Sequence, residues 1–416
     1  MTFMQGLAAA GIVATMALPV LLPGGYWWGP LWLGLLGLLA LMGRLIPGWL
    51  RVRPLCRLGW GLALILLLFG ASQLAMAAYH GELLGLWPLV VPVLLALLAL
   101  PALHAWLPSL TWLWTGLALG GMTTGVWALW QALNGVRRAS GHEPLHAILY
   151  GNLSLLSGVL CLAGIGWALN GPRRSGWLAL LALGALGGVA ASVLSGTRGG
   201  WVALPLILLV FQRGFGRWLP RGKAAAWWLG AGVLLAALYV LPQTGVQHRV
   251  SLAVAEVEHY LTGEEAKTSS VTTRLEMWQG ALGLIVERPL LGHGEAGYEE
   301  GVRSRVKAGE IDRAVLAHAH AHNDLLDAWA KRGVPGLVAL LGLYLLPLWL
   351  FRSGLNHPDS SHRALAVAGL LLPVTFLDFG MTYSFLAYPV GTAVFCGWLV
   401  VLWTFYRHTP LSRKSG

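Results

Sequence analysis

The sequence predicts an all-α polytopic membrane protein with about 12 transmembrane helices, and two observations support this fold class. Only 11% of the 416 residues are charged and 56% are hydrophobic, with a mean hydropathy of +0.66. A soluble domain carries about 25% charged residues, so most of this protein's surface must face something other than water. Apolar runs also recur along the chain, each long enough to cross a hydrocarbon core of about 30 Å as a helix.

Twelve apolar segments follow one another along the chain. No basic residue precedes the first, so we interpret it as a retained span rather than a cleaved signal peptide. The three cysteines lie far apart, in or beside apolar runs, which argues against a disulfide framework or a zinc site. The predicted spans are 3–23, 27–43, 58–79, 85–103, 110–131, 148–168, 176–195, 200–212, 225–241, 334–351, 364–382 and 385–406.

Basic residues gather between alternate spans. Fifteen Lys and Arg residues occupy one set of short connections and the C-terminal tail, whereas the opposite short connections hold only Arg137, Arg138 and Arg198. Short loops rich in Lys and Arg stay in the cytoplasm, so both termini are expected there. The net charge of +11 therefore reflects membrane topology, and no nucleic-acid partner is expected.

One connection, residues 242–333, is far longer than the rest and is expected outside the cytoplasm. It contains 13 of the 17 acidic residues, and a loop of this length in a compact protein is usually functional or disordered. Within it, TTRLEMWQGALGLIVERP predicts a helix with a capping box at Thr273 and Glu276 and an end at Pro289.

Three regions follow from this pattern. The long connection is expected to form a mainly helical loop domain that carries catalytic residues. It would lie between transmembrane helices 1–9, in residues 1–241, and transmembrane helices 10–12 with a cytoplasmic tail, in residues 334–416.

The stretch AHAHAHNDLLDAWAKRG, residues 317–333, concentrates polar chemistry. Its three histidines share one face only if the segment is extended, and a zinc site would need a further ligand such as Asp324 or Asp327. The leucines repeat at helical spacing, so we expect His322 to start or cap a helix, with His318 and His320 in the preceding turn. Three interpretations remain open: a catalytic or ligand-positioning His322, plain interfacial histidines, and a metal site.

Two arginines are candidates for binding an anion. Arg198, in SGTRGGW, lies at the outer end of a span between glycines that leave backbone N–H groups open, although it could simply snorkel to lipid headgroups. Arg274 is expected in the first turn of the loop helix, where a bound phosphate would be favoured, unless it pairs with Glu276. Two arginines would suit a diphosphate, because guanidinium groups bind phosphate through two parallel hydrogen bonds.

Two other features receive a structural interpretation. GHGEAG, residues 292–297, matches G-x-G-x-x-G but follows a helix rather than a strand, so we expect a glycine-rich turn that packs on the bundle. The predicted spans contain very few charges, of which Asp378 is the clearest. This scarcity argues against a transporter, since transporters usually carry ionisable residues along their pathway.

Taken together, these features resemble the O-antigen ligase family, the membrane glycosyltransferases that complete bacterial lipopolysaccharide. The family motif is matched by His322-Asn323, nine residues, Gly333, two residues and Gly336. The family also has about twelve spans, a large periplasmic loop, and arginines at the places of Arg198 and Arg274. The resemblance covers the whole chain in architecture, but the motif is shared with O-antigen polymerases and protein O-oligosaccharyltransferases.

This resemblance implies a GT-C-like enzyme of the bacterial inner membrane with its active site facing the periplasm. Its donor would be O-antigen polysaccharide on undecaprenyl diphosphate, and its acceptor a sugar hydroxyl of lipid A–core, both met among membrane lipids. The transfer would be inverting and would need neither metal nor other cofactor. Alternatives are a polymerase or protein-glycosylating enzyme of the same superfamily, and, from a different class, a polyprenyl-lipid transporter or flippase.

The resemblance also assigns roles to residues. His322 would be the catalytic base, and Arg198 and Arg274 would bind the diphosphate and stabilise its developing charge. Asn323, the motif partner of His322, is a further substrate-binding candidate. Arg137 and Arg138 could contact acceptor phosphates, and Asp324 or Asp327 could orient His322, whereas His318 and His320 receive no role.

Overall fold

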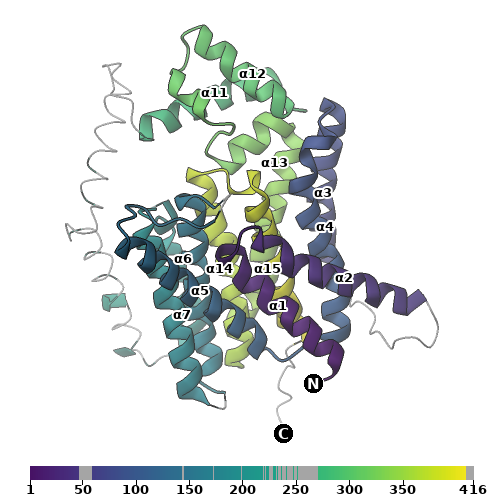
Figure 1. Ribbon diagram of the computed structural model, residues 1–416, viewed down its shortest axis with the longest axis vertical. Helices are drawn as coiled ribbons and strands as arrows, with labels where there is room; N and C mark the ends of the chain where they lie inside the picture. Colours follow the sequence, from purple (N-terminus) through teal and green to yellow (C-terminus); the bar gives the residue numbers. More distant parts are fainter. Residues whose placement is uncertain are drawn as a thin grey trace.

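A computed structural model gives the architecture of the described part of the chain. All secondary-structure elements assigned in this part are helices, which confirms the predicted all-α class. Long helices lie side by side as a bundle, and α11 and α12 lie beyond one end of it (Figure 1). The described residues are 1–45, 59–142, 145–171, 173–197, 199–218 and 270–408, with isolated positions between 220 and 251.

Eleven of the described helices correspond in position to predicted spans. The ninth predicted span, 225–241, falls almost entirely outside the described residues. The eleven helices are α1 (Phe3–Leu21), α2 (Gly25–Leu45), α3 (Gly59–His80), α4 (Leu83–Trp106), α5 (Thr111–Leu133), α6 (Ala147–Ala168), α7 (Arg174–Leu194), α8 (Leu204–Phe215), α13 (Asp324–Phe351), α14 (Ser360–Thr382) and α15 (Pro389–His408).

Ten helical segments of the described part are long and apolar enough to cross a membrane, which makes the chain a multi-pass membrane protein. The α5 helix, although 23 residues long, is not among them, because its glycines, threonines and tryptophans lower its hydropathy. It packs inside the bundle against α7, where a Cβ on Gly121 would lie 2.2 Å from the Gly184 carbonyl oxygen. Such close backbone approach between small residues is typical of membrane helix pairs.

The centre of the bundle consists of α6, α14 and α15. Their apolar windows are buried on nearly all sides, whereas α3, α7 and α8 leave most of theirs uncovered. Because lipid is as apolar as leucine, the uncovered faces of the outer helices are suited to contact with acyl chains.

The two ends of the bundle are defined by side-chain contacts. At one end, Gln5 approaches the Leu107 carbonyl at 3.4 Å and the His104 and His408 rings lie 4.7 Å apart. We call this the terminal end, because α1 begins and α15 ends there. At the other end, which we call the loop end, α11 and α12 lie beyond the membrane-crossing helices (Figure 1).

At the loop end, α11 (Ser270–Glu287) and α12 (Gly294–Lys307) pack on the start of α13. The predicted capping box is wrong, because α11 already includes Ser270 and Thr273 therefore lies inside the helix. The Glu276 carboxylate instead accepts a hydrogen bond from the Asp312 backbone N–H at 3.0 Å. The predicted end before Pro289 is confirmed.

The helix α13 contains a break at Gly333. This residue has φ 62° and ψ −160°, a conformation that is essentially restricted to glycine. A Cβ added there would lie 2.2 Å from the Leu290 carbonyl oxygen. The next N–H, of Val334, bonds the Pro289 and Leu290 carbonyls at 3.1 Å. Gly333 thus joins the short outer part of α13 to its membrane part and to the α11–α12 connection.

Replacing Gly333 by alanine is expected to destabilise the protein by about 1–3 kcal/mol through backbone strain alone, with a further cost from the clash at Leu290. The thermal unfolding midpoint of the detergent-purified protein measures this effect. Gly85→Ala is the matched control, since Gly85 lies in α4 with open space around it. An unchanged midpoint in Gly333→Ala would contradict the proposed backbone requirement.

Candidate active site

The backbone around His322 is held in an unusual conformation. Asn323 is the N-cap of α13, and its Oδ1 accepts hydrogen bonds from the Leu325 and Leu326 N–H groups at 3.0 and 3.1 Å. The expectation that His322 caps the helix is therefore corrected by one residue. His322 has φ +52°, the left-handed region that is uncommon for residues other than glycine. Such strain persists only where the surroundings enforce it.

Two charged residues of α13 enforce this conformation. The Asp327 carboxylate accepts a hydrogen bond from the Ala321 N–H at 2.9 Å, and the Lys331 ammonium donates to the Ala319 carbonyl at 3.0 Å. Lys331 also pairs with Asp327 at 3.2 Å and with Glu295 of α12 at 2.7 Å. Because Asp327 and Lys331 are buried, these ion pairs are shielded from water and fix the loop before α13.

Neither aspartate contacts the His322 ring within the described residues. Asp327 acts on the backbone, whereas the Asp324 carboxylate accepts hydrogen bonds from the Tyr344 hydroxyl at 2.9 Å and the Leu386 N–H at 3.0 Å. The suggestion that one of them orients the imidazole directly therefore has no support in the geometry.

Six aromatic rings from three distant parts of the chain meet at the loop end, and we call them the histidine–tyrosine cluster. The His320 and His322 rings stack at 4.5 Å, and the Tyr383 ring lies 4.8 Å from His322 and 4.9 Å from His320. The cluster consists of His146 before α6, His318, His320 and His322 before α13, and Tyr383 and Tyr388 between α14 and α15.

The His322 imidazole has one engaged and one free nitrogen. Its Nε2 lies 3.3 Å from His318 Nδ1, at hydrogen-bonding distance, whereas its Nδ1 is buried without a partner among the described residues. Burial first, and then the neighbouring His320 and His318 and the charge of Arg274, lower the pKa of His322 to about 2. The ring is thus neutral near pH 7 and retains a lone pair that can accept a proton.

Arg274 lies close enough to this cluster for its charge to act on two of the rings. Burial, followed by the Arg274 charge, lowers the pKa of His318. Arg274 is half-buried, and its Nε has no partner in the part of the chain that the structure describes. Because α11 begins by Ser270, Arg274 lies beyond the first turn, so the expected help from the helix N-terminus is weaker than predicted.

Of the other predicted arginines, Arg137 and Arg138 belong to the described residues and Arg198 does not. Arg138 is exposed, yet its Nε donates to the Ser195 carbonyl at 3.0 Å, and its charge contributes, after burial, to a lowered pKa of His146. Arg137 is exposed in the same connection. Arg198 lies outside the described residues. The residue before it, Thr197, bonds the Ala147 carbonyl at 2.9 Å, at the start of α6.

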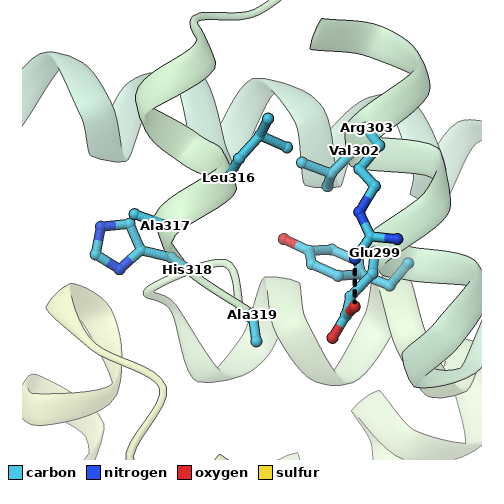
Figure 2. Close-up of a pocket in the computed structure, with 8 residues that line it drawn as sticks. Glu299, Val302, Arg303, Leu316, Ala317, His318 and Ala319 are labelled. Atoms are coloured by element: carbon cyan, nitrogen blue, oxygen red, sulfur yellow. Dashed lines mark hydrogen bonds and ion pairs between the residues drawn. The ribbon is translucent and has the colours of Figure 1, made fainter.

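A cavity of about 190 Å³ lies between α12 and the segment 316–319, on the far side of this loop. Figure 2 shows the imidazole of His318 pointing away from the Glu299 and Arg303 side chains that line it. The Glu299–Arg303 ion pair, at 3.2 Å, spans one wall. His318, a member of the histidine–tyrosine cluster, also lines this cavity, so the cavity adjoins the cluster at that residue.

The glycine-rich segment 292–297 packs on the bundle as expected, but it is a turn only in part, because α12 begins at Gly294. Gly292 and Gly294 have φ of 68° and 73°, and the Glu82 carboxylate accepts hydrogen bonds from the Glu295 and Ala296 N–H groups, both at 2.8 Å. The N-terminus of α12 is thus occupied by a carboxylate of the protein itself.

The metal interpretation of the three histidines gains no support from the geometry. Among the described residues, no three His, Cys, Asp or Glu side chains are grouped in a way that could hold a metal ion. The histidine nitrogens bond one another, the loop backbone and the Tyr388 hydroxyl instead.

Three members of the cluster, His146, Tyr383 and Tyr388, were not identified from the sequence. Each lies at the end of a span, where tyrosine and other amphipathic aromatics are common for interfacial reasons alone. Only a motif spanning several distant segments could have singled them out, because His146 and Tyr383 are 237 positions apart.

Comparison with known proteins gives two matches. Residues 180–341 match the family described as O-antigen ligase. This region runs from α7 into the membrane part of α13 and includes Arg198, Arg274, His322, Gly333 and Gly336. An uncharacterized protein of Haemophilus influenzae is 31% identical over 207 residues, which are 49% of this chain and 51% of that protein.

The chain thus spans about half the length of that relative, whose name states no activity. The family match covers both arginines, the histidine and both motif glycines. Residues 180–341 of this chain are thus similar to the O-antigen ligase family.

Proposed function

We propose that this protein is an inner-membrane glycosyltransferase that moves O-antigen polysaccharide from undecaprenyl diphosphate to a sugar hydroxyl of lipid A–core. The family match over residues 180–341 supports a glycosyltransferase of the O-antigen ligase type. The observation that carries the proposal is a neutral His322 whose Nδ1 lacks a partner among the described residues, within reach of the charge of Arg274, whose Nε likewise lacks one there.

The chemistry is a single displacement. The acceptor oxygen attacks the anomeric carbon from the face opposite the diphosphate, the C1–O bond breaks, and its electron pair leaves with the diphosphate. The hydroxyl proton passes to His322 Nδ1, and the anomeric centre inverts. A general base contributes about 10²–10⁴-fold to a rate when its pKa lies near the working pH, and the negative charge of the bound diphosphate raises the pKa of His322 toward that range. Because Nδ1 is covered in this structure, the acceptor reaches it only after local displacement of the atoms above it.

The tautomer of His322 follows from this role. For Nδ1 to carry the lone pair, Nε2 must carry the hydrogen, which it then donates to His318 Nδ1 at 3.3 Å. His318 accordingly positions His322 in the way that a carboxylate orients a catalytic histidine. This gives one of the two upstream histidines a role that the sequence did not suggest.

The leaving diphosphate needs positive charge where its negative charge develops. Arg274 supplies it from α11, with the proposed help of Arg198 from the SGTRGGW segment. Preorganised donors aimed at developing charge are usually the largest single contribution to such a reaction. The position of α11 and α12 at the end of the bundle opposite the start of α1 (Figure 1) supports a periplasmic site with cytoplasmic termini.

The test is transfer by the purified full-length protein from an undecaprenyl-diphosphate-linked glycan to lipid A–core. Product formation, undiminished by a strong chelator, supports the ligase. Extension of the donor glycan instead of the acceptor would identify a polymerase, and modification of a peptide acceptor would identify a protein-glycosylating enzyme. Lipid translocation without any transfer would overturn the enzyme proposal in favour of a flippase.

The pH dependence of kcat/KM is expected to be flat from about pH 8 down to about pH 5.5. A base acts only above its pKa, and the lowered pKa of His322 keeps it unprotonated across this range. An ordinary histidine, with a pKa of about 6.5, would lose activity about tenfold per unit below that value. Initial rates at subsaturating donor measure this profile. A fall in kcat/KM as the pH drops below about 6.5 would contradict the prediction.

A further inference from the structure

The hydrogen bonds of the histidine–tyrosine cluster can be assigned a direction from the backbone contacts. His320 Nδ1 accepts the His322 backbone N–H at 3.3 Å, so this nitrogen carries no hydrogen. Burial above all lowers the pKa of His320 to about 4, so the ring is neutral and its single hydrogen is on Nε2. That N–H therefore donates to the Tyr388 hydroxyl oxygen, 3.1 Å away.

The same reasoning fixes the other branch of the cluster. His146 Nδ1 accepts the Ile148 N–H at 3.3 Å, and burial followed by the charge of Arg138 lowers the His146 pKa. Its Nε2–H thus donates to the Tyr383 hydroxyl oxygen at 2.7 Å. The Tyr383 O–H in turn donates to the Tyr388 oxygen at 2.6 Å.

Both branches end on the Tyr388 oxygen, which receives two hydrogen bonds. A phenol has one O–H and accepts through its oxygen, so the Tyr388 hydrogen is left to donate elsewhere. In the described ranges no acceptor for it is found, and the side chain is half-buried. A polar hydrogen in such a place costs free energy unless a partner is supplied, and an oxygen of a bound ligand would supply it.

The charge around the cluster indicates which kind of ligand oxygen would accept the Tyr388 hydrogen. Arg274 acts on His318 and His322, and Arg138 acts on His146, so the neutral rings lie within the positive potential of two guanidinium groups. Two carboxylates interact with His320, those of Asp327 and Glu295, and both are already paired with Lys331, at 3.2 and 2.7 Å. The local potential therefore favours an anionic oxygen over a neutral one.

We infer that the Tyr388 hydroxyl donates a hydrogen bond to a phosphate oxygen of the polyprenyl diphosphate donor. The Tyr388 oxygen already accepts two hydrogen bonds, so its own O–H is oriented toward the ligand. This assignment rests on the proposed function for the identity of the diphosphate. It adds to the arginines a neutral donor on the α14–α15 connection, outside the segment that matches the family.

Tyr388→Phe tests the contact, because it removes one oxygen atom and retains the ring. Binding of undecaprenyl diphosphate without sugar to the full-length protein in nanodiscs is expected to weaken about tenfold or more, the usual effect of a lost hydrogen bond to a charged group. Tyr383→Phe leaves the Tyr388 O–H in place and is expected to weaken binding less. Tyr406→Phe is the matched control, since that hydroxyl contacts Ser353 at the terminal end at 3.3 Å.

The source of the phosphate is distinguished by parallel titrations. Weakened binding of undecaprenyl diphosphate and inorganic pyrophosphate, with unchanged binding of phosphatidylglycerol, supports the inference. Equal weakening for phosphatidylglycerol would overturn it in favour of a general headgroup site, and unchanged affinity in Tyr388→Phe would overturn it outright. Because binding is measured without transfer, the two proposals can fail separately. A wild-type protein that binds undecaprenyl diphosphate but fails to transfer glycan would contradict the proposed function and leave the Tyr388 contact standing.

Discussion

Replacing His322 by asparagine is expected to lower the rate of glycan transfer by about 10²–10⁴-fold, the contribution of a positioned general base. Asparagine is suitable because it tolerates the left-handed backbone that His322 adopts at φ +52°. The variant should therefore insert and fold while lacking a group that accepts the acceptor proton. Turnover of the purified protein at saturating donor and acceptor measures the effect.

His408→Asn is the matched control for this variant. His408 lies at the terminal end, where its Nδ1 contacts the Thr404 carbonyl at 2.9 Å, and its replacement is expected to leave transfer unchanged. If His322→Asn retained wild-type turnover, the base would have to be another group. His318→Gln gives a graded readout, since it keeps a hydrogen-bonding side chain and should lose less activity than His322→Asn.

The membrane helices could be predicted well because a span is a local property of about 20 residues. The predicted span 148–168 and the observed α6, Ala147–Ala168, differ by one residue at the start and agree at the end. Most of the expected spans have comparable helices. α5 is a more instructive case: it is a long helix as predicted, yet its low hydropathy excludes it from the spans defined by composition.

Helix ends near the site were predicted less well because they depend on contacts with residues that are distant in the sequence. Thr273 and Glu276 have the spacing of a capping box, but Glu276 bonds the Asp312 backbone. The start of α13 at Asp324, with Asn323 as its N-cap, lies close to the expected start or cap at His322. The break in α13 depends on the approach of the Leu290 carbonyl, which no local pattern encodes.

The residues of the candidate site could also be predicted only in part. His322 and Arg274 came from the family motif and the loop helix, and the structure brings Arg274 close enough to act on His322. His146, Tyr383 and Tyr388 could not be predicted, since their meeting depends on how α6, α14 and α15 pack. Their chemistry is also ambiguous in a sequence, because a tyrosine at a span end suits a membrane interface equally well.

Arg274→Ala is expected to reduce kcat by about 10²–10³-fold, the typical cost of removing one donor that stabilises developing charge. The charge on the diphosphate grows as the C1–O bond breaks, so the loss should fall more on kcat than on the KM for the donor. Arg274→Lys should recover part of the rate, since lysine restores the charge without the planar pair of donors that suits a phosphate.

Arg303→Ala is the matched control, because Arg303 lies on α12 and pairs in solvent with Glu299 at 3.2 Å. It removes the same charge from the same end of the protein and should leave kcat unchanged. Similar losses in both variants would mean that overall positive potential drives the effect, whereas full activity in Arg274→Ala would remove Arg274 from the mechanism. A selective loss in Arg274→Ala, with partial recovery by lysine, supports direct stabilisation of the leaving diphosphate.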